Sequence, residues 1–254
     1  MKITILGSGA ACGTPNACNI LKTDIDLNNP KNVRMRSSAF FETDKGNFMV
    51  ECGPDFRHQT CRFNVNNFEN IFLSHQHFDH IGGIWELVRV SSNIGKEINI
   101  FGNEETIKEV ETCFYYMFKQ GKEGFVKLNI IEPYKELKLP NTDISLMPLN
   151  FTHKDKEILG FKLDNMVYTP DFCEFNDETS KYLYDLDLWI FELTSLQDIK
   201  RGHNYLSQTF DLVDKYNPKK VVLNHLSEEI DFDKVSKMIP LNSKLAYDGM
   251  EIKI

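Results

Sequence analysis

The chain has 254 residues, a net charge of −8 and a pI of about 5.4, with 41% hydrophobic and 26% charged residues. These values are typical of a folded globular protein, and the acidic balance argues against a protein that wraps long nucleic acid, which needs basic surface. No segment approaches the roughly 18 consecutive apolar residues of a membrane-spanning helix, so we expect no membrane span.

Short strand-like runs recur along the chain and alternate with turn residues. They are Ile3–Leu6, Ala39–Glu42, Phe48–Val50, Ile71–Leu73, Ile98–Phe101, Ile144–Met147, Ile158–Leu163, Met166–Tyr168, Leu188–Phe191, Val221–Leu223 and Leu245–Tyr247. Helical patterns lie between some of them, at Gly83–Ser92, Glu104–Lys119, Tyr205–Lys215 and Asp233–Met238. The polar segment 21–38 reads as one long loop. This mixture predicts a layered α/β fold with two sheets and helices packed outside, as one domain over residues 1–254.

The six cysteines are scattered and form no CxxC pair. They therefore do not suggest a disulfide framework, and free thiols in a reducing cytoplasm are the expected state.

A cluster of histidines follows the predicted strand Ile71–Leu73. His75, His77, Asp79 and His80 occupy one six-residue stretch, and glycines follow it before the next helical pattern. A loop at the end of a strand can present several side chains into one cleft. Imidazole and carboxylate groups are the ligands of zinc and other transition metals, so this stretch predicts a metal site.

Three further polar residues come directly after short apolar runs: His153, Asp171 and His225. With the preceding H-x-H-x-D-H stretch, their order and spacing resemble the metallo-β-lactamase superfamily. The resemblance implies an αββα four-layer sandwich with two metals at the edge where the sheets meet. It further implies that His75, His77 and His153 hold one metal and that Asp79, His80 and His225 hold the second, with Asp171 bridging them.

A narrower resemblance extends over nearly the whole chain. The opening Gly7-Ser8-Gly9, the turn Gly53-Pro54-Asp55 and the ending near Asp248-Gly249 are similar to a subgroup that contains the phosphodiesterase of carbon–phosphorus lyase metabolism, which hydrolyses a cyclic ribosyl phosphate. The likeness implies that His203 assists the phosphate or the leaving group.

The sequence departs from this subgroup at two places. Cys18 and Glu228 do not reproduce that subgroup's structural zinc ligands, so no structural zinc is expected, and Glu51 replaces the usual Asp before the Gly-Pro turn.

These likenesses predict a hydrolase in which a hydroxide bridging two divalent metals attacks phosphorus. Zinc is favoured, with manganese or iron as alternatives. Asp79 orients or deprotonates the nucleophile, and His203 offers a proton to the leaving oxygen. Arg34, Arg36 and Arg57 are candidate phosphate contacts, although ordinary surface arginines are the simpler interpretation. Asp248 is a candidate to bind the outer nitrogen of a ligand histidine, with a plain turn as the equal alternative.

Alternative functions stay open on the same ligand set. They are a thioester or lactone hydrolase, a tRNA 3′-processing endoribonuclease, a diiron redox protein and a non-catalytic binding protein of a cofactor pathway. The short segment between His153 and Asp171 leaves little room for the arm of the tRNA enzymes, and His77 argues against the diiron class. We expect a small phosphorylated substrate and no long nucleic acid. A homodimer is left open.

Overall fold

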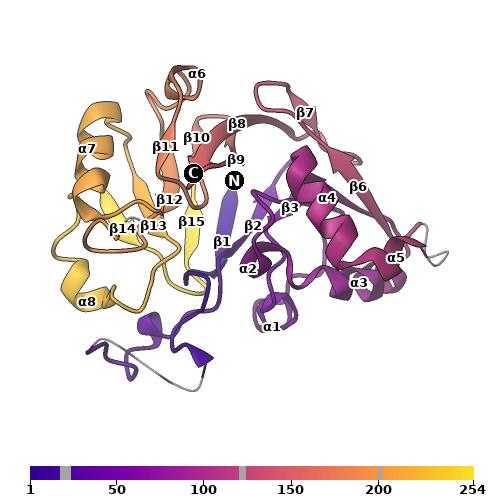
Figure 1. Ribbon diagram of the computed structural model, residues 1–254, viewed down its shortest axis with the longest axis horizontal. Helices are drawn as coiled ribbons and strands as arrows, with labels where there is room; N and C mark the ends of the chain where they lie inside the picture. The colour runs from indigo at the N-terminus through magenta and orange to yellow at the C-terminus, as the bar shows by residue number, and fades with distance from the viewer. Residues whose placement is uncertain (18–23, 120–123, 200–201) are drawn as a thin grey trace.

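Two β-sheets face each other in the computed structural model, which describes residues 1–17, 24–119, 124–199 and 202–254 (Figure 1). The first sheet runs in the order β15 (Glu251–Lys253), β1 (Lys2–Gly7), β2 (Ser38–Thr43), β3 (Gly46–Val50), β4 (Asn70–Phe72), β5 (Ile98–Gly102) and β6 (Val126–Ile130). The second runs in the order β11 (Glu174–Phe175), β8 (Ser145–His153), β9 (Lys156–Leu163), β10 (Met166–Tyr168), β12 (Leu188–Glu192), β13 (Val221–Asn224) and β14 (Ser243–Leu245), with β7 (Leu137–Lys138) paired to β8.

Each sheet combines an antiparallel part with a parallel part. Strands β3 to β6 pair in parallel, as do β10, β12, β13 and β14. Parallel neighbours need crossover connections, which helices usually supply. Here the connections in the first sheet carry α1 (Phe56–Arg62), α2 (Phe78–Ile81), η3 (Ile84–Glu86), α3 (Leu87–Ile94), α4 (Glu104–Cys113) and α5 (Tyr115–Lys119), and those in the second carry α6 (Asp177–Ser180), α7 (Leu206–Tyr216) and α8 (Phe232–Val235).

Successive side chains of a strand point to opposite faces of its sheet, and each face packs in a different apolar core. In β12, Leu188 and Ile190 face the core between the two sheets, whereas Trp189 and Phe191 face the core beneath α7. A third apolar cluster packs the first sheet against α1, α3, α4 and α5. Because each sheet buries both faces, the order of layers is helix, sheet, sheet, helix, which confirms the predicted αββα sandwich (Figure 1).

Most predicted elements are present, with shifted ends. The helix predicted over 104–119 is divided at Phe114 into α4 and α5, and the run predicted at 144–147 continues as the long strand β8 to His153. The described part of the predicted loop pairs with the N-terminal segment, through the bridges Gly9↔Arg36 and Thr14↔Arg34, and contains η2 (Pro30–Asn32). Among the described residues, no helix is both long enough and apolar enough to span a bilayer.

Candidate metal centre

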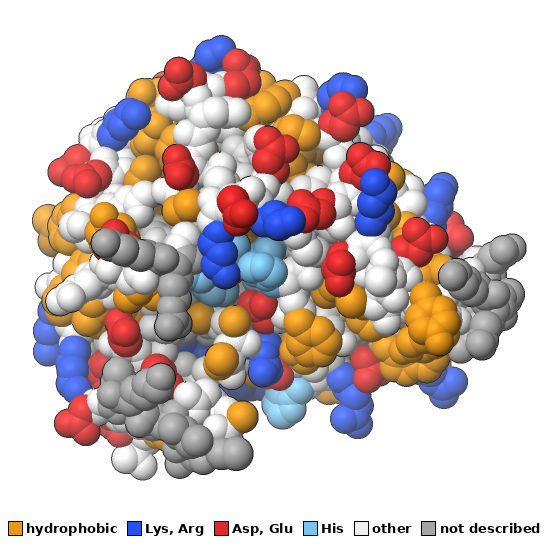
Figure 2. All heavy atoms as spheres, viewed as in Figure 1, with side chains coloured by type: hydrophobic (Ala, Val, Ile, Leu, Met, Phe, Trp, Pro, Cys, Tyr) orange, Lys and Arg blue, Asp and Glu red, His pale blue; other side chains and the backbone are white. Residues whose placement is uncertain are grey.

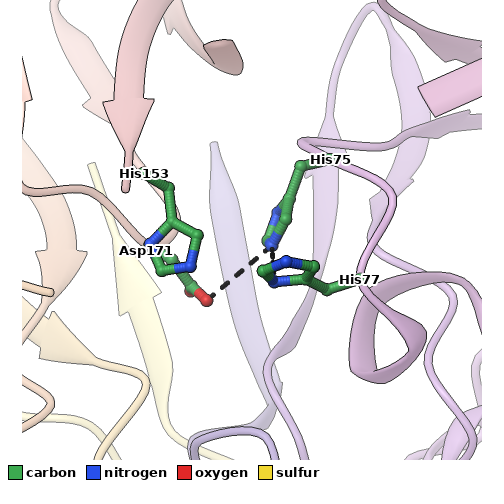
Figure 3. Close-up of side chains that lie close together, drawn as sticks. All are labelled: His75, His77, His153 and Asp171. Atoms are coloured by element: carbon green, nitrogen blue, oxygen red, sulfur yellow. Dashed lines mark hydrogen bonds and ion pairs between the residues drawn. The ribbon is translucent and has the colours of Figure 1, made fainter. Parts of the chain in front are cut away.

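Polar side chains from both sheets converge where several strands end. Strand β4 leads into the loop and short helix that carry residues 75–80, and β8 ends at His153. Asp171 follows β10, and His225 follows β13. Figure 3 shows His75 and His77 on one side, with His153 and Asp171 approaching them from the other. The fold therefore unites residues that are up to 150 positions apart in the chain.

The first group consists of His75, His77, His153 and Asp171, whose potential ligand atoms all lie within 4.8 Å of one another. His75 Nε2 is 2.9 Å from His77 Nδ1 and 3.9 Å from Asp171 Oδ2. His77 lies immediately before α2, and its extended backbone turns the ring toward His75.

The second group consists of Asp79, His80, Asp171 and His225, again within 4.8 Å. Asp171 Oδ2 is 3.5 Å from His80 Nε2 and 3.2 Å from His225 Nε2. Asp171 thus belongs to both groups, as the resemblance implied for a bridging ligand. The structure brings together all seven residues predicted as ligands.

Burial sets the protonation of the first group. It lowers the pKa of His75 well below the ordinary value and also lowers the pKa values of His77 and His153. These rings are therefore neutral near pH 7 and offer lone pairs to a cation.

The carboxylates of the second group remain ionised. Burial favours the neutral acid, but the charge of His80 at Asp79, and those of His225 and His80 at Asp171, outweigh it and hold both pKa values well below their ordinary range. Conversely, burial disfavours the charged form of His80, yet the surrounding carboxylates Asp79, Glu51 and Asp171 raise its pKa. The centre is a compact cluster of anionic and imidazole groups.

The outer ring nitrogens of the histidines have partners that fix ring orientation. Ser74 Oγ lies 2.9 Å from His75 Nδ1, and His153 Nδ1 donates to the carbonyl oxygen of Gly202 at 2.7 Å. Such contacts leave the opposite nitrogen, Nε2, facing the centre.

Two ligand candidates of the second group are oriented by buried polar residues. Thr194 Oγ1 lies 2.9 Å from His225 Nδ1, and Glu51 Oε1 lies 3.2 Å from His80 Nδ1, in poor alignment for a hydrogen bond. Glu51 and His225 both have left-handed backbone, with φ of 66° and 52°. Glu51 is fully buried and also accepts from Ser74 N, so the replacement of Asp by Glu noted in the sequence lies in direct contact with this loop.

Unpaired buried atoms indicate that the cluster fits metal ions. Among the described residues, Asp171 Oδ1, His80 Nε2 and His225 Nε2 have no hydrogen-bond partner, although each is buried. Buried polar atoms are rarely left unpaired in native proteins. Imidazole nitrogens and carboxylate oxygens in groups of four match the donors that zinc uses.

A third group, formed by Glu192, His203 and His225, adjoins the centre. His203 Nδ1 donates to Glu192 Oε2 at 2.9 Å, and its ring centroid is 4.6 Å from that of His153. Burial lowers the pKa of His203, but the charge of Glu192 and this hydrogen bond outweigh burial and raise it to about 9. His203 is therefore a cation near pH 7 with Nε2 available to a ligand.

Glu192 is a functional candidate that the sequence analysis missed. It is buried and accepts hydrogen bonds from the Phe172 and Asn204 backbone amides and from Thr194 Oγ1, besides His203. It ends β12, just as His153 ends β8. The signal was available, since a carboxylate directly after the apolar run 188–191 repeats the strand-end pattern of the other site residues.

Arg34 and Arg36, which were predicted as phosphate contacts, both have partners within the protein. Arg34 is 3% exposed, and its guanidinium donates to the carbonyl oxygens of Lys31, Ser227 and Ile230. Its donors are committed to holding the N-terminal loop onto the segment after His225. Arg36 donates to the Ala11 carbonyl and pairs with Asp55 at 3.0 Å. Arg57 is exposed on α1, and its contact with a substrate stays a prediction.

Asp248 also has other partners than expected. Its carboxylate accepts from Ser8 N, Ser8 Oγ and Met35 N at 2.8–2.9 Å, so it joins the end of β1 to the N-terminal loop. The outer nitrogens of His75, His153 and His225 are instead met by Ser74, Gly202 and Thr194.

The predicted absence of a structural zinc depends partly on Cys18, which lies outside the described residues. Glu228, the other residue of that prediction, accepts a hydrogen bond from Asn16 Nδ2 at 3.0 Å.

Sequence comparisons place this geometry among known proteins. The family described as "Beta-lactamase superfamily domain" matches residues 46–226. An octanoyltransferase of Porphyromonas gingivalis is 24% identical over 257 residues, covering 99% of this chain and 51% of the relative, so the chain spans about half of that protein's length. A ribonuclease Z of Listeria welshimeri is 24% identical over 310 residues, covering 99% of this chain and 96% of the relative.

Solved structures share the fold. A diphosphatase described as from the PhnP family superposes with a TM-score of 0.89 at 22% identity, covering 100% of this chain and 97% of the other. Zn²⁺-bound PqqB from Methylobacterium extorquens has a TM-score of 0.81 at 16% identity, covering 100% of both chains. At such identities the likeness shows a common fold.

Proposed function

The chain belongs to the β-lactamase superfamily and has the metallo-β-lactamase fold, and from this premise we propose that it is a metal-dependent phosphodiesterase acting on a small or cyclic phosphodiester. The observation that carries the proposal is the position of His203, whose Nδ1 is bound by Glu192 and whose ring lies beside two candidate metal ligands, His153 and His225. A positioned acid next to a dinuclear centre suits a reaction whose leaving oxygen must be protonated.

The residues present would hold two divalent cations, in the groups His75, His77, His153, Asp171 and Asp79, His80, Asp171, His225. When bound, such ions lower the pKa of water and neutralise charge on phosphate oxygens. Zinc suits the donor set, and manganese or iron would also bind.

The chain's own residues supply orientation and proton transfer. Asp79 Oδ2 lies at the centre, where it would orient the attacking water or accept its proton. His203 Nε2 donates a proton to the leaving oxygen as the bond to phosphorus breaks, and Glu192 keeps the donating nitrogen directed outward by binding Nδ1. Proton and charge are therefore balanced within the site.

A substrate panel with metal-loaded protein tests this proposal. We expect turnover of bis(p-nitrophenyl) phosphate or a cyclic nucleotide, and none of a thioester, a lactone or precursor tRNA. His203→Ala should lower kcat by about 10²- to 10⁴-fold with metal content unchanged. His58→Ala, an exposed histidine on α1, is the matched control and should retain full turnover. Cleavage of the thioester without phosphodiester turnover would overturn the choice of reaction.

Two alternatives have specific support. The relatives named ribonuclease Z favour tRNA processing, yet residues 154–170 form the compact strands β9 and β10 rather than a protruding arm. The relative named for octanoyl transfer favours an acyl thioester, although its name describes a protein about twice as long.

A further inference from the structure

Lys154 occupies a tight turn directly after a candidate metal ligand. His153 pairs with Lys156 at the end of the β8–β9 ladder, so residues 154 and 155 alone form the connection. Lys154 has φ of 56°, in the left-handed region. Two-residue hairpin turns favour glycine, asparagine or aspartate at such positions because a Cβ and a long side chain are disfavoured there. A lysine in this conformation is unusual, and unusual backbone geometry clusters at functional sites.

Gly202 holds the stem of Lys154 in place. A Cβ added to Gly202 would lie 2.5 Å from Lys154 N and 2.6 Å from Lys154 Cγ, so the two residues are in close contact that only glycine permits. The same Gly202 accepts the hydrogen bond from His153 Nδ1. The lysine stem is therefore fixed relative to His153 and to His203, the residue after Gly202.

The side chain of Lys154 is exposed and directly follows His153, the last residue of β8. Its positive charge lowers the pKa values of both His77 and His203, although other groups have larger effects on each ring. Lys156, two positions further, pairs with Glu105, whereas Lys154 forms no ion pair with any carboxylate in the described part of the chain. Figure 2 shows Lys and Arg side chains directly beside the histidine side chains near the centre of this face. An exposed cation beside the proposed acid is suited to an anion that arrives with the substrate.

We propose that Lys154 binds a negatively charged group on the leaving part of the substrate, so that the centre prefers diphosphates, whose leaving group is itself a phosphomonoester. This rests on the proposed phosphodiesterase function. In the reaction, water forms the new bond to one phosphorus, the bridging P–O bond breaks, and the departing phosphate takes a proton at the side of His203. Lys154 stabilises the charge that remains on that phosphate.

Lys154→Asn is the decisive variant because asparagine tolerates left-handed backbone and removes the charge. Lys156→Asn changes the same charge in the same hairpin and is the matched control. The probes are di(adenosine-5′) diphosphate and bis(p-nitrophenyl) phosphate, whose leaving group has no additional charged substituent. We expect Lys154→Asn to raise KM for the diphosphate about tenfold, as loss of one charge-assisted contact implies, and to change KM for the other probe less than twofold.

Binding and stability provide readouts that do not depend on turnover. Calorimetry with adenosine 5′-monophosphate and metal-loaded protein should show a Kd about tenfold higher for Lys154→Asn than for the wild type or Lys156→Asn. The thermal midpoint of Lys154→Asn should be equal or higher, because asparagine relieves the backbone conformation.

The two proposals can fail separately. If the wild type cleaves neither phosphate probe, the proposed function fails, and nucleotide binding still decides the role of Lys154. An unchanged Kd for adenosine 5′-monophosphate in Lys154→Asn, or equal increases in KM for both probes, would overturn the role in recognising the leaving group. Lys154→Arg should restore most of the affinity, since it restores the charge.

Discussion

Arg34 illustrates how burial changes the meaning of a single residue. Its guanidinium is enclosed, and burial lowers its pKa to about 10, although Asp248 and Asp231 oppose this effect. The group donates to three backbone carbonyls and to Asn32 Oδ1. Arg34 therefore serves the packing of the N-terminal loop rather than a substrate.

Arg34→Met should lower the free energy of unfolding by about 2–4 kcal/mol, because it leaves buried carbonyl oxygens without donors. We expect KM for a phosphodiester to remain within twofold at temperatures below unfolding. Urea denaturation and steady-state kinetics check the two parts. Arg57→Met, at an exposed position, should change stability by less than about 0.5 kcal/mol. A tenfold rise in KM for Arg34→Met at unchanged stability would instead support phosphate binding.

At the scale of single residues, the sequence carries information on local chemistry and little on contacts that depend on packing. One short stretch contains His75, His77, Asp79 and His80. So many potential ligands close together indicate a metal site without any knowledge of the fold. The partners of Arg34 or Asp248 depend on which loop covers them, and no local pattern reports this. Lys154 was missed because a turn lysine is ordinary until its φ and its contact with Gly202 are known.

At the scale of elements, Asp231 joins the start of α8 to the N-terminal loop. Its side chain accepts from Lys234 N at 3.0 Å, as the N-cap of the helix, and from Asn32 Nδ2 at 3.1 Å and Asp26 N at 3.3 Å. Burial favours the neutral acid, but these donors outweigh it and hold its pKa below the ordinary 3.8.

Asp231→Ala should lower the free energy of unfolding by about 1–2 kcal/mol at pH 7, as loss of a cap implies. A carboxyl group with a lowered folded-state pKa stabilises the fold above its unfolded pKa and loses this effect as pH falls through the folded value. The difference between wild type and variant should therefore shrink below about pH 4. Urea unfolding at pH 7 and at pH 3 measures it. A difference that is equal at both pH values contradicts the assignment.

The elements that were predicted are those with strong apolar patterns. Strand β12 is buried along its whole length, so its run of large apolar residues is unambiguous. Helix α1 was missed because only Phe56 and Gln59 of it are buried, which leaves no apolar period to detect. Strand β6 lies at a sheet edge and mixes polar with half-buried residues, so its pattern resembled a loop. The division of the helix at Phe114 depends on tertiary packing, which the spacing of apolar residues in the sequence does not reveal.

For the whole molecule, the candidate metal centre links the two sheets. His75, His77, Asp79 and His80 follow a strand of the first sheet, whereas His153, Asp171 and His225 follow strands of the second. Bound cations should consequently stabilise the packing of one sheet on the other, because binding to the folded state alone shifts the unfolding equilibrium.

Removal of metal by a chelator should lower the thermal midpoint by about 8–16 °C, which corresponds to roughly 4 kcal/mol for ligand at a thousand times its Kd in a chain of this size. Differential scanning calorimetry of the chelated and metal-supplemented protein measures the shift. His58→Ala should show the same shift, and Asp171→Ala should lose most of it together with metal content. Identical midpoints with and without chelator in the wild type would argue against the centre.

Two expectations about the whole molecule stay predictions: one domain over residues 1–254 and a cytoplasmic location. The homodimer stays an open alternative. The sandwich itself was predictable because the ligand pattern resembles a family with this fold, and the mixture of strands and helices agrees with it. The meeting of Glu192 with His203 was not, since it depends on how the segment after β12 returns to the centre.

Glu51, Lys154 and His225 share left-handed backbone, and all three border the candidate centre. Glycine and asparagine tolerate left-handed backbone, so protein engineers who aim to stabilise the fold would replace these residues first. Substitutions at these three positions should raise the thermal midpoint but lower turnover. Mutant libraries designed for stability should therefore leave them unchanged.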